Sequence, residues 1–348
     1  QPSLAALEDQ VFASAADQRQ AVLATLVGQT QTAQAPLRSL LDQVGAGEPQ
    51  GTNTLVLMKP GDQSQPLFLI HPIGGSVLFY REIVDAMDFP GAIYGIEAVG
   101  LNSIEAPHTS IEQMAEHYFD LVQSVQPEGA YLFAGYSSGG VIAFALAQHA
   151  MAIGFEVAFL GMINSRFIFR RTKEQKTFTS LLPAYFDYVR ERGLVISIKE
   201  FWQNHRYWQK VQKAETMLET QGKTLEVRRQ ALIDQALLQT SSNRYATVQQ
   251  LQQLAIRYYQ PGLCSADIHL YKTTGYHDFR PGEIGWSKVV TGALNKIRIP
   301  GHHLTLVTGK NAVDVGQILT YSISGVTDSS TDAVSQPPSV EERTTSEI

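Results

Sequence analysis

Residues 131–149 read YLFAGYSSGGVIAFALAQH, and this stretch decides the fold. A short apolar run leads into Gly135-Tyr136-Ser137-Ser138-Gly139, which has the G-x-S-x-G pattern, and an apolar helical run, Val141–His149, follows. Glycines permit a sharp turn between a strand and a helix, which would lift the Ser137 hydroxyl above the end of a sheet. The positive end of the helix would then lie near developing negative charge. The stretch predicts a nucleophilic serine on a strand-to-helix turn; the alternative is a tight turn without a catalytic role.

Short apolar runs alternate with helical patterns on both sides of this stretch. The runs that predict strands are 54–61, 66–72, 91–98, 154–164, 265–275 and 295–301, and the other helical patterns cover 77–87, 109–124 and 310–321. Such alternation is typical of βαβ units with a mostly parallel sheet covered on both faces. The predicted fold is therefore α/β, with a central sheet flanked by helices, and the first run is expected to be an edge strand.

A long helical stretch, residues 165–262, interrupts this alternation and is rich in aromatic residues. Because it lies between two predicted strands, we expect an insertion that forms a lid over the strand ends; an ordinary helical subdomain is the alternative. Residues 1–53 are polar and end in turn residues, which favours a partly ordered linker. The predicted domain covers 54–321, and the Ser-, Thr- and Pro-rich segment 322–348 is expected to be a disordered tail.

Composition excludes several classes of function. The 348 residues are 44% hydrophobic and carry a formal net charge of -6, so the chain can bury a core and has no basic excess for a nucleic-acid partner. No apolar run approaches the roughly 18 residues of a membrane helix, and no signal peptide opens the chain. The single cysteine, Cys264, forms no internal disulfide and is expected to be buried packing rather than a catalytic thiol. We expect a cytoplasmic protein, cut from a longer polypeptide.

Two further loops extend the serine-hydrolase pattern. His71-Pro72-Ile73-Gly74-Gly75-Ser76 follows a predicted buried strand, and the backbone N–H groups of Ile73 and Ser138 are the expected oxyanion donors. Pro300-Gly301-His302-His303-Leu304 follows the last predicted strand, from which a histidine can reach the serine as general base. The residues alone leave both histidines open. The other seven histidines show no compact metal-ligand spacing, so no metal site is predicted.

Together, HPIGGS (71–76), GYSSGG (135–140) and PGHH (300–303) resemble the thioesterase domains that close polyketide synthases and non-ribosomal peptide synthetases, within the α/β-hydrolase superfamily. The resemblance covers roughly residues 54–321, and the Gly-Trp pair in GEIGWSKVV (282–290) supports it. It implies that Ser137 is the nucleophile and, from the family pattern Pro-Gly-x-His, that His303 is the base.

The same resemblance implies the substrate and the partner. A long acyl chain would arrive on the phosphopantetheine of an acyl carrier protein domain, form an acyl-enzyme, and leave by hydrolysis or macrolactonisation, with no bound cofactor. The lead-in ADQRQAVLATLVGQTQTA (16–33) favours a polyketide synthase and disfavours a detached editing thioesterase. Two alternatives stay open: a carboxylesterase or lipase with the same catalytic residues, and a degenerate, non-catalytic acyl-binding domain.

One position departs from the family pattern. The family ends the strand after the nucleophile helix with an aspartate that orients the histidine, whereas this chain has Asn164 there. An amide cannot stabilise imidazolium by charge and can favour the wrong tautomer, a change that costs about 10⁴ in turnover in a serine protease. Three interpretations follow. The orienting acid has moved to Asp278, with Glu283 as a weaker candidate; or Asn164 itself orients the histidine and the enzyme is slow. In the third interpretation, Asn164 was introduced to trap an acyl-enzyme. Asp278 could equally be a solvated loop residue.

Overall fold

The structure is a computed structural model, and it describes residues 54–103, 105–165, 209, 211–240, 243–273, 285–301, 303 and 305–327. The chain divides into two units, 1–51 and 52–348, and every described residue belongs to the second. The predicted linker at 1–53 lies outside the described residues, as do residues 328–348 of the predicted tail and the loop that carries Asp278 and Glu283.

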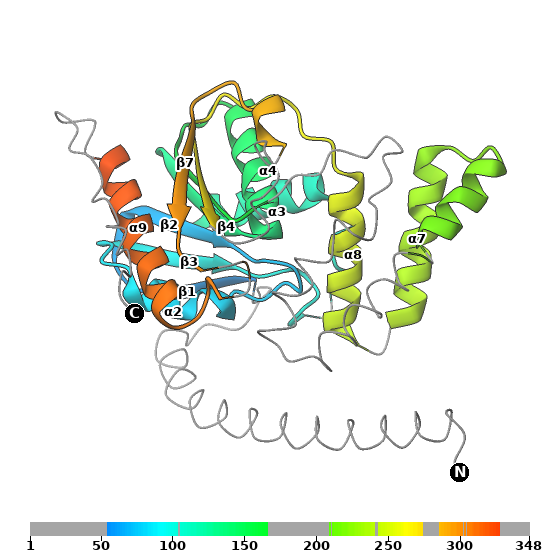
Figure 1. Ribbon diagram of the computed structural model, residues 1–348, viewed down its shortest axis with the longest axis horizontal. Coiled ribbons are helices and arrows are strands. Elements are labelled where there is room, and N and C mark those ends of the chain that lie inside the picture. Colours follow the sequence, from blue (N-terminus) through cyan, green and yellow to red (C-terminus); the bar gives the residue numbers. More distant parts are fainter. Residues whose placement is uncertain are drawn as a thin grey trace, which may run out of the picture. The chain divides into compact units, whose positions relative to one another are not determined.

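Seven strands form one sheet in the order β1-β3-β2-β4-β5-β6-β7 (Figure 1). Their bounds are β1 (Leu55–Lys59), β2 (Asp62–Ile70), β3 (Gly91–Ile96), β4 (Tyr131–Tyr136), β5 (Val157–Ile163), β6 (Ile268–Thr273) and β7 (Leu294–Ile299). Only the edge strand β1 is antiparallel to its neighbour, and the other five pairs are parallel. The predicted α/β class, the parallel sheet and the edge position of the first strand are confirmed. β2 begins at Asp62 rather than at residue 66, because Asp62 pairs with Gly91 and donates its N–H to the Pro90 carbonyl.

Helices cover both faces of the sheet (Figure 1). One face carries α3 (Ile111–Val125) and α4 (Ser138–Ala152), and the other carries α2 (Arg81–Ala86) and α9 (Gly309–Thr327). Side chains alternate along each strand, so Phe68 of β2 packs in the first core and Leu67 in the second. Burial on both faces explains why the central strands are apolar without interruption. α9 continues through Thr327, so the predicted tail cannot begin at 322: residues 322–327 are helical, because Ile323 still packs in the core.

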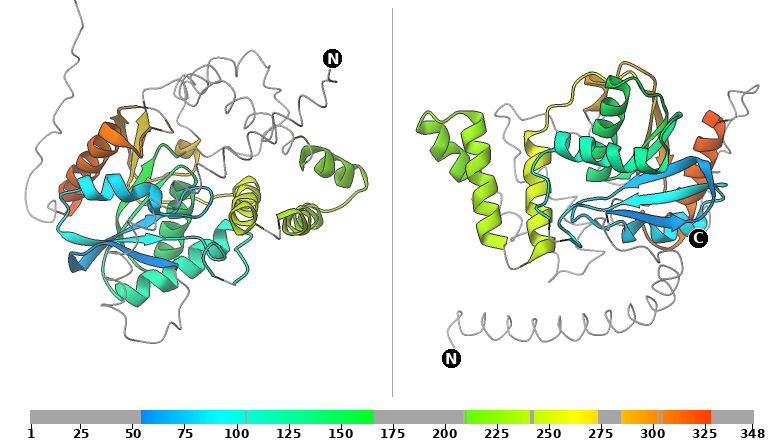
Figure 2. Two further views of the ribbon diagram at one scale, coloured as in Figure 1. Left: turned by 90° about the horizontal axis from the view of Figure 1, so that it is seen from below. Right: turned by 180° about the vertical axis from the view of Figure 1, so that it is seen from behind.

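The insertion lies between β5 and β6, as predicted. The structure describes in it a helical segment 211–220, α7 (Leu225–Thr240) and α8 (Arg244–Tyr258), and α7 lies beyond α8 as seen from the sheet (Figures 1 and 2). These helices share a small apolar core of their own: Val211, Leu232, Ile233, Ala236, Leu251 and Leu254. No helix in the described part of the chain is long and apolar enough to cross a bilayer.

The carboxyl ends of the parallel strands meet at one edge of the sheet, where α/β proteins place their sites. The loop at 71–77 follows β2, Ser137 follows β4, and Asn164 follows β5. His303 follows β7 on the same edge. The topology therefore brings together four segments that are far apart in the sequence.

Candidate active site

Ser137 occupies a strained turn between β4 and α4. Its backbone has φ 57° and ψ -119°, a conformation that costs a non-glycine residue on the order of 1–3 kcal/mol. The N–H of Ser137 donates to the Ile163 carbonyl at 2.9 Å and helps to hold this conformation. Among the described residues, Ser137 and Asn164 are the two non-glycine residues with positive φ. Strain at these positions is typical of a functional site rather than of an ordinary turn.

The glycines of the serine motif are required by close backbone approaches. A Cβ at Gly135 would overlap the backbone of Gly139, and a Cβ at Gly139 would overlap the carbonyl of Ile70 in β2. A Cβ at Gly140 would overlap the hydroxyl of Ser165. The turn therefore packs tightly against the neighbouring strand ends, and Ser137 stands at the N-terminus of the 15-residue helix α4.

The hydroxyl of Ser137 lies 3.1 Å from Nε2 of His303. The structure thus brings the predicted nucleophile and His303 within hydrogen-bond distance, while His302 lies outside the described residues. Tyr136 secures this histidine, since its hydroxyl donates to the His303 carbonyl and its ring centre lies 5.0 Å from the imidazole centre. Sequence reasoning missed Tyr136; its position between Gly135 and Ser137 is the signal that could have found it.

The buried Tyr80 ties this turn to the neighbouring strand. Its hydroxyl donates to the Ile70 carbonyl at 2.6 Å and accepts the N–H of Tyr136 at 2.7 Å. Burial raises the pKa of Tyr80 well above its ordinary value, so the phenol stays neutral. Tyr80 therefore fixes the distance between the end of β2 and the turn that carries Ser137, a role that no sequence motif signals.

Asn164, at the position where the resemblance implies an acid, follows the end of β5. It is 3% exposed, its N–H donates to the Tyr271 carbonyl at 2.7 Å, and its φ is 46°. Asparagine and aspartate adopt this left-handed conformation more readily than most residues do. The side-chain Nδ2 lies 3.0 Å from Nδ1 of His303. The structure therefore joins Ser137, His303 and Asn164 in one chain of contacts, while Asp278 lies outside the described residues.

The orientation of the Asn164 amide determines what His303 can do. An amide nitrogen that donates to Nδ1 leaves the imidazole proton on Nε2, which then cannot accept the proton of Ser137. The opposite orientation presents Oδ1 to an Nδ1–H and frees Nε2 as a base. A carboxylate offers only acceptors and selects the productive tautomer in either orientation.

The glycine-rich loop 71–77 is held in a compact turn beside Ser137's helix. Gly74 and Gly75 have φ of 92° and 89°, and Gly75 N–H donates to the Pro72 carbonyl at 3.0 Å. The buried carboxylate of Glu97, at the end of β3, accepts from the Ser76 hydroxyl at 3.0 Å. The loop begins at the end of β2, and the first turn of α4 lies against that strand end because Gly139 packs on the carbonyl of Ile70. Ile73 and Ser138, the predicted oxyanion donors, lie on these two adjoining segments.

His71 begins this loop and is fully buried. Its Nε2 lies 2.7 Å from the hydroxyl of Tyr118, and its Nδ1 lies 3.0 Å from the Pro72 carbonyl. Burial lowers the pKa of His71 to about 4, so the ring is neutral at pH 7. His71 is thus a structural support of the loop.

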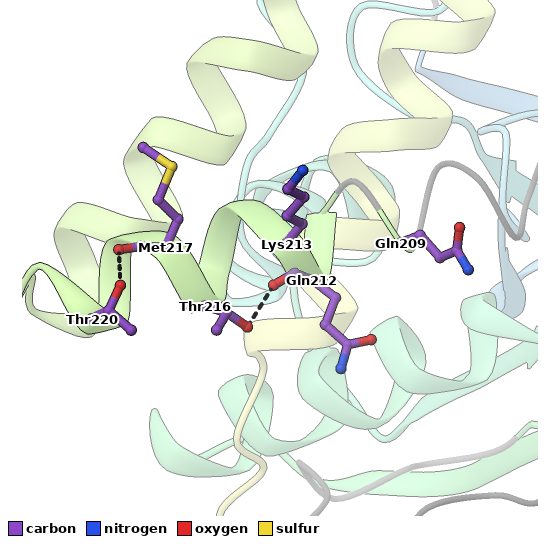
Figure 3. Close-up of a pocket in the computed structure, with 6 residues that line it drawn as sticks. All are labelled: Gln209, Gln212, Lys213, Thr216, Met217 and Thr220. Carbon is purple, nitrogen blue, oxygen red and sulfur yellow. Dashed lines mark hydrogen bonds between the residues drawn. The ribbon is translucent and has the colours of Figure 1, made fainter.

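Two hollows in the described structure lie apart from these residues. One, of about 550 Å³, is lined by a single stretch of the insertion (Figure 3): Gln209, Gln212, Lys213, Thr216, Met217 and Thr220. The other adjoins His108 and His117, whose ring centres lie 5.1 Å apart. Within the described ranges, no three His, Cys, Asp or Glu side chains are arranged to hold a metal ion. Cys264 is buried, and burial raises the pKa of its thiol, which confirms the packing interpretation.

Comparison with protein families matches residues 65–320 to the thioesterase domain. The chain belongs to the thioesterase domain family. It is an enzyme domain of the hydrolase or cyclase type with an α/β-hydrolase fold, as its sequence motifs predicted. The match spans the sheet from within β2 to β7, the insertion and most of α9, and leaves out the edge strand β1.

Relatives of this thioesterase domain are parts of much longer proteins. It is 37% identical over 123 residues to the nonribosomal peptide synthetase btyA of Aspergillus terreus, which covers 35% of this chain and 13% of the relative. It is 36% identical over 111 residues to the polyketide synthase PksR of Bacillus subtilis, covering 32% of this chain and 4% of the relative. The chain therefore spans only a small part of the relatives' length.

Solved structures share the fold of this thioesterase domain at low sequence identity. A four-domain nonribosomal peptide synthetase, holo-AB3403 bound to AMP and glycine, matches 82% of this chain with 21% of its own length, at 21% identity and a TM-score of 0.57. The thioesterase domain SrfTE, described for cyclization of the lipopeptide antibiotic surfactin, matches 80% of this chain and 98% of its own, at 19% identity and a TM-score of 0.50. These likenesses support the α/β-hydrolase fold.

Proposed function

We propose that this domain releases a polyketide-type acyl chain from the phosphopantetheine thioester of an acyl carrier protein, through an acyl-enzyme on Ser137. The observation that carries the proposal is the 3.1 Å contact between Ser137 Oγ and His303 Nε2, on a strained turn at a helix N-terminus. Similarity to parts of PksR and btyA supports a carrier-bound acyl substrate, because these relatives are a polyketide synthase and a nonribosomal peptide synthetase.

Acyl transfer begins with attack of Ser137 Oγ on the thioester carbonyl while His303 Nε2 takes the hydroxyl proton. The N–H groups of Ile73 and Ser138 stabilise the tetrahedral oxyanion, and the positive end of α4 adds to this field. The C–S bond then breaks, and the phosphopantetheine thiolate takes the proton from the imidazolium.

Release repeats these steps with a second nucleophile. His303 takes a proton from water or from a hydroxyl of the acyl chain, and the resulting oxygen attacks the Ser137 ester. Collapse returns the proton to Ser137 and yields a free acid with water or a macrolactone with the internal hydroxyl. Asn164 orients His303 in both steps with its amide turned so that Oδ1 accepts from Nδ1–H, the orientation that frees Nε2 as a base. Asp278 remains a prediction for this orienting role.

A matched pair of substrates and one variant test the proposal. The full chain is assayed with a long-chain acyl N-acetylcysteamine thioester and with the corresponding p-nitrophenyl ester. We expect turnover of the thioester and a loss of at least about 10³-fold in Ser137→Ala, with unchanged circular dichroism and thermal unfolding. Thioester turnover retained by Ser137→Ala would overturn the mechanism. Turnover of the ester alone would favour a carboxylesterase, and no reaction of Ser137 with a fluorophosphonate would favour a non-catalytic acyl-binding domain.

A further inference from the structure

We infer that Gln252, on helix α8 of the insertion, is a positioning residue that sets the backbone of the oxyanion loop 71–77. This inference rests on the proposed function, since it concerns the loop that supplies Ile73 N–H to the oxyanion. The amide of Gln252 is 2% exposed and reaches the loop from the inserted helices rather than from the sheet.

The side chain of Gln252 contacts the loop with both of its polar atoms. Its Oε1 accepts the N–H of Gly74 at 2.8 Å, and its Nε2 lies 3.2 Å from Nδ1 of His71. The Gly74 N–H is therefore already bonded and is not the donor that the loop offers to an oxyanion, which agrees with the prediction of Ile73 N–H for that role.

Gln252 and His71 each hold one of the two peptide planes on either side of Ile73. A trans peptide is planar, so fixing its carbonyl oxygen also fixes the direction of the N–H on its other side. The peptide plane that carries Ile73 N–H also contains the Pro72 carbonyl, whose oxygen lies 3.0 Å from His71 Nδ1. The next plane has Gly74 N–H, which Gln252 binds directly. Gln252 thus fixes the plane of Gly74 N–H, and the Nδ1–H of His71 fixes the other plane by donating to the Pro72 carbonyl.

Neighbouring residues of α8 pack on the same loop. Tyr245, Val248 and Gln252 are spaced three and four residues apart and so share one helix face. A Cβ added at Gly74 would lie 2.6 Å from the Tyr245 hydroxyl, and one added at Gly75 would lie 3.0 Å from Val248 Cγ1. The glycines therefore permit α8 to lie directly on the loop, and Gln252 supplies the polar contact within that interface.

α8 is in turn anchored to the rest of the insertion. Arg257 forms a salt bridge with the largely buried Glu215, and the hydroxyl of Tyr258 donates to the same carboxylate. Leu251, next to Gln252, is fully buried in the insertion's own core. The position of the oxyanion loop is therefore coupled to the packing of the inserted helices, in addition to the support that Glu97 provides from β3.

Two substitutions at position 252 and one beside it test this role. Gln252→Met removes the acceptor for Gly74 N–H at nearly constant length, and Gln252→Glu keeps an acceptor for Gly74 N–H at nearly constant shape. Gln253→Met is the matched control, on the same helix and only partly buried. Thermal unfolding of each variant shows whether it folds, and Ser137→Ala is assayed alongside.

We expect Gln252→Met to lower kcat for the acyl thioester about 10- to 100-fold, with KM within about threefold, because a misplaced oxyanion donor costs less than the 10²–10³ of a deleted one. Gln252→Glu should retain more activity than Gln252→Met, and Gln253→Met should match the native chain. An alkylboronic acid, which forms a tetrahedral anion on Ser137, should bind more weakly in proportion to the loss in kcat/KM, while a thioether analogue of the substrate should bind unchanged.

The inference is overturned if folded Gln252→Met keeps the native kcat/KM, or if its KM alone rises while the boronic acid binds as before. An equal loss in Gln252→Glu and Gln252→Met would also contradict it, because the acceptor for Gly74 would then be irrelevant. Full activity in Ser137→Ala would instead refute the proposed function, and the inference with it.

Discussion

The side-chain nitrogen of Asn164 lies 3.0 Å from Nδ1 of His303, at the position where related thioesterase domains were expected to carry an aspartate. Asn164 has the left-handed backbone, the burial and the contact that an orienting acid would have, but not the charge. The geometry of a catalytic triad is thus retained while one of its electrostatic contributions is missing.

Asn164→Asp should therefore accelerate the domain. The carboxylate selects the productive tautomer of His303 and stabilises the imidazolium, so kcat is expected to rise at least about tenfold, towards the 10⁴ that the reverse change costs a serine protease. Single-turnover kinetics with an acyl thioester measures the rate of acyl transfer and release in both proteins. An unchanged rate would indicate that another group already orients His303, and then Asp278→Asn should lower the rate sharply.

The tight turn at Ser137 predicts a steep cost for a small change. Gly135→Ala places a methyl group against the backbone of Gly139, and we expect a loss of at least about 3 kcal/mol in the free energy of unfolding, together with loss of acyl transfer. Gly325→Ala in α9 is the control, because nothing lies within 4 Å of its added methyl and alanine favours a helix by about 1 kcal/mol. Equal stability of the two variants in urea would contradict the close packing of the turn.

Burial of His71 predicts a pH dependence of stability. The pKa of His71 is lowered to about 4 in the folded chain from an ordinary value of 6.5. Between these values the unfolded chain binds the proton and the folded chain does not, so the free energy of unfolding falls as the pH drops. One such group contributes at most about 1.4 kcal/mol per pH unit.

Urea unfolding of the native chain and His71→Gln at about pH 7, 6 and 5 measures this contribution. The variant should lose less stability per pH unit than the native chain, while the lowered pKa values of His108 and His269 leave it a residual slope. Parallel pH profiles for the two proteins would show that His71 does not titrate as the buried ring requires.

Tyr80 offers a test of how the turn is held. Tyr80→Phe leaves the Ile70 carbonyl and the Tyr136 N–H without the hydroxyl that now bonds both, in a fully buried place. Each buried group left unpaired costs about 1–3 kcal/mol, so we expect a destabilisation of about 2–4 kcal/mol and a slower reaction of Ser137 with a fluorophosphonate. Tyr94→Phe is the control, because the hydroxyl of Tyr94 forms its hydrogen bond at an exposed position; this variant should change neither the stability nor the rate of the fluorophosphonate reaction.

Much of the fold could be predicted because β3, β4, β5 and the second half of β2 are continuous apolar runs, and a sheet buried on both faces requires such runs at its centre. The contact between Ser137 and His303 follows from two short motifs at the ends of parallel strands, which one sheet edge must bring together. The length of α9 was underestimated, since its last turn, with Ser324 and Gly325, has the composition of a tail although Ile323 is buried.

Other parts of the site have no signal in the sequence. Gln252 lies in the stretch TVQQLQQLAIRYY, where four glutamines look alike, and only the packing of α8 on Gly74 and Gly75 distinguishes it. Tyr80 likewise depends on a contact with Tyr136, far along the chain. Such contacts depend on tertiary packing, which local pattern does not encode.

The most direct test of the central claim is the intact mass of the full chain after mixing with a long-chain acyl thioester. The account predicts one added acyl group, mapped by peptide digestion to Ser137, absent in Ser137→Ala and cleared faster in Asn164→Asp. Thioester turnover without any acyl group on Ser137, or an unchanged adduct in Ser137→Ala, would contradict it.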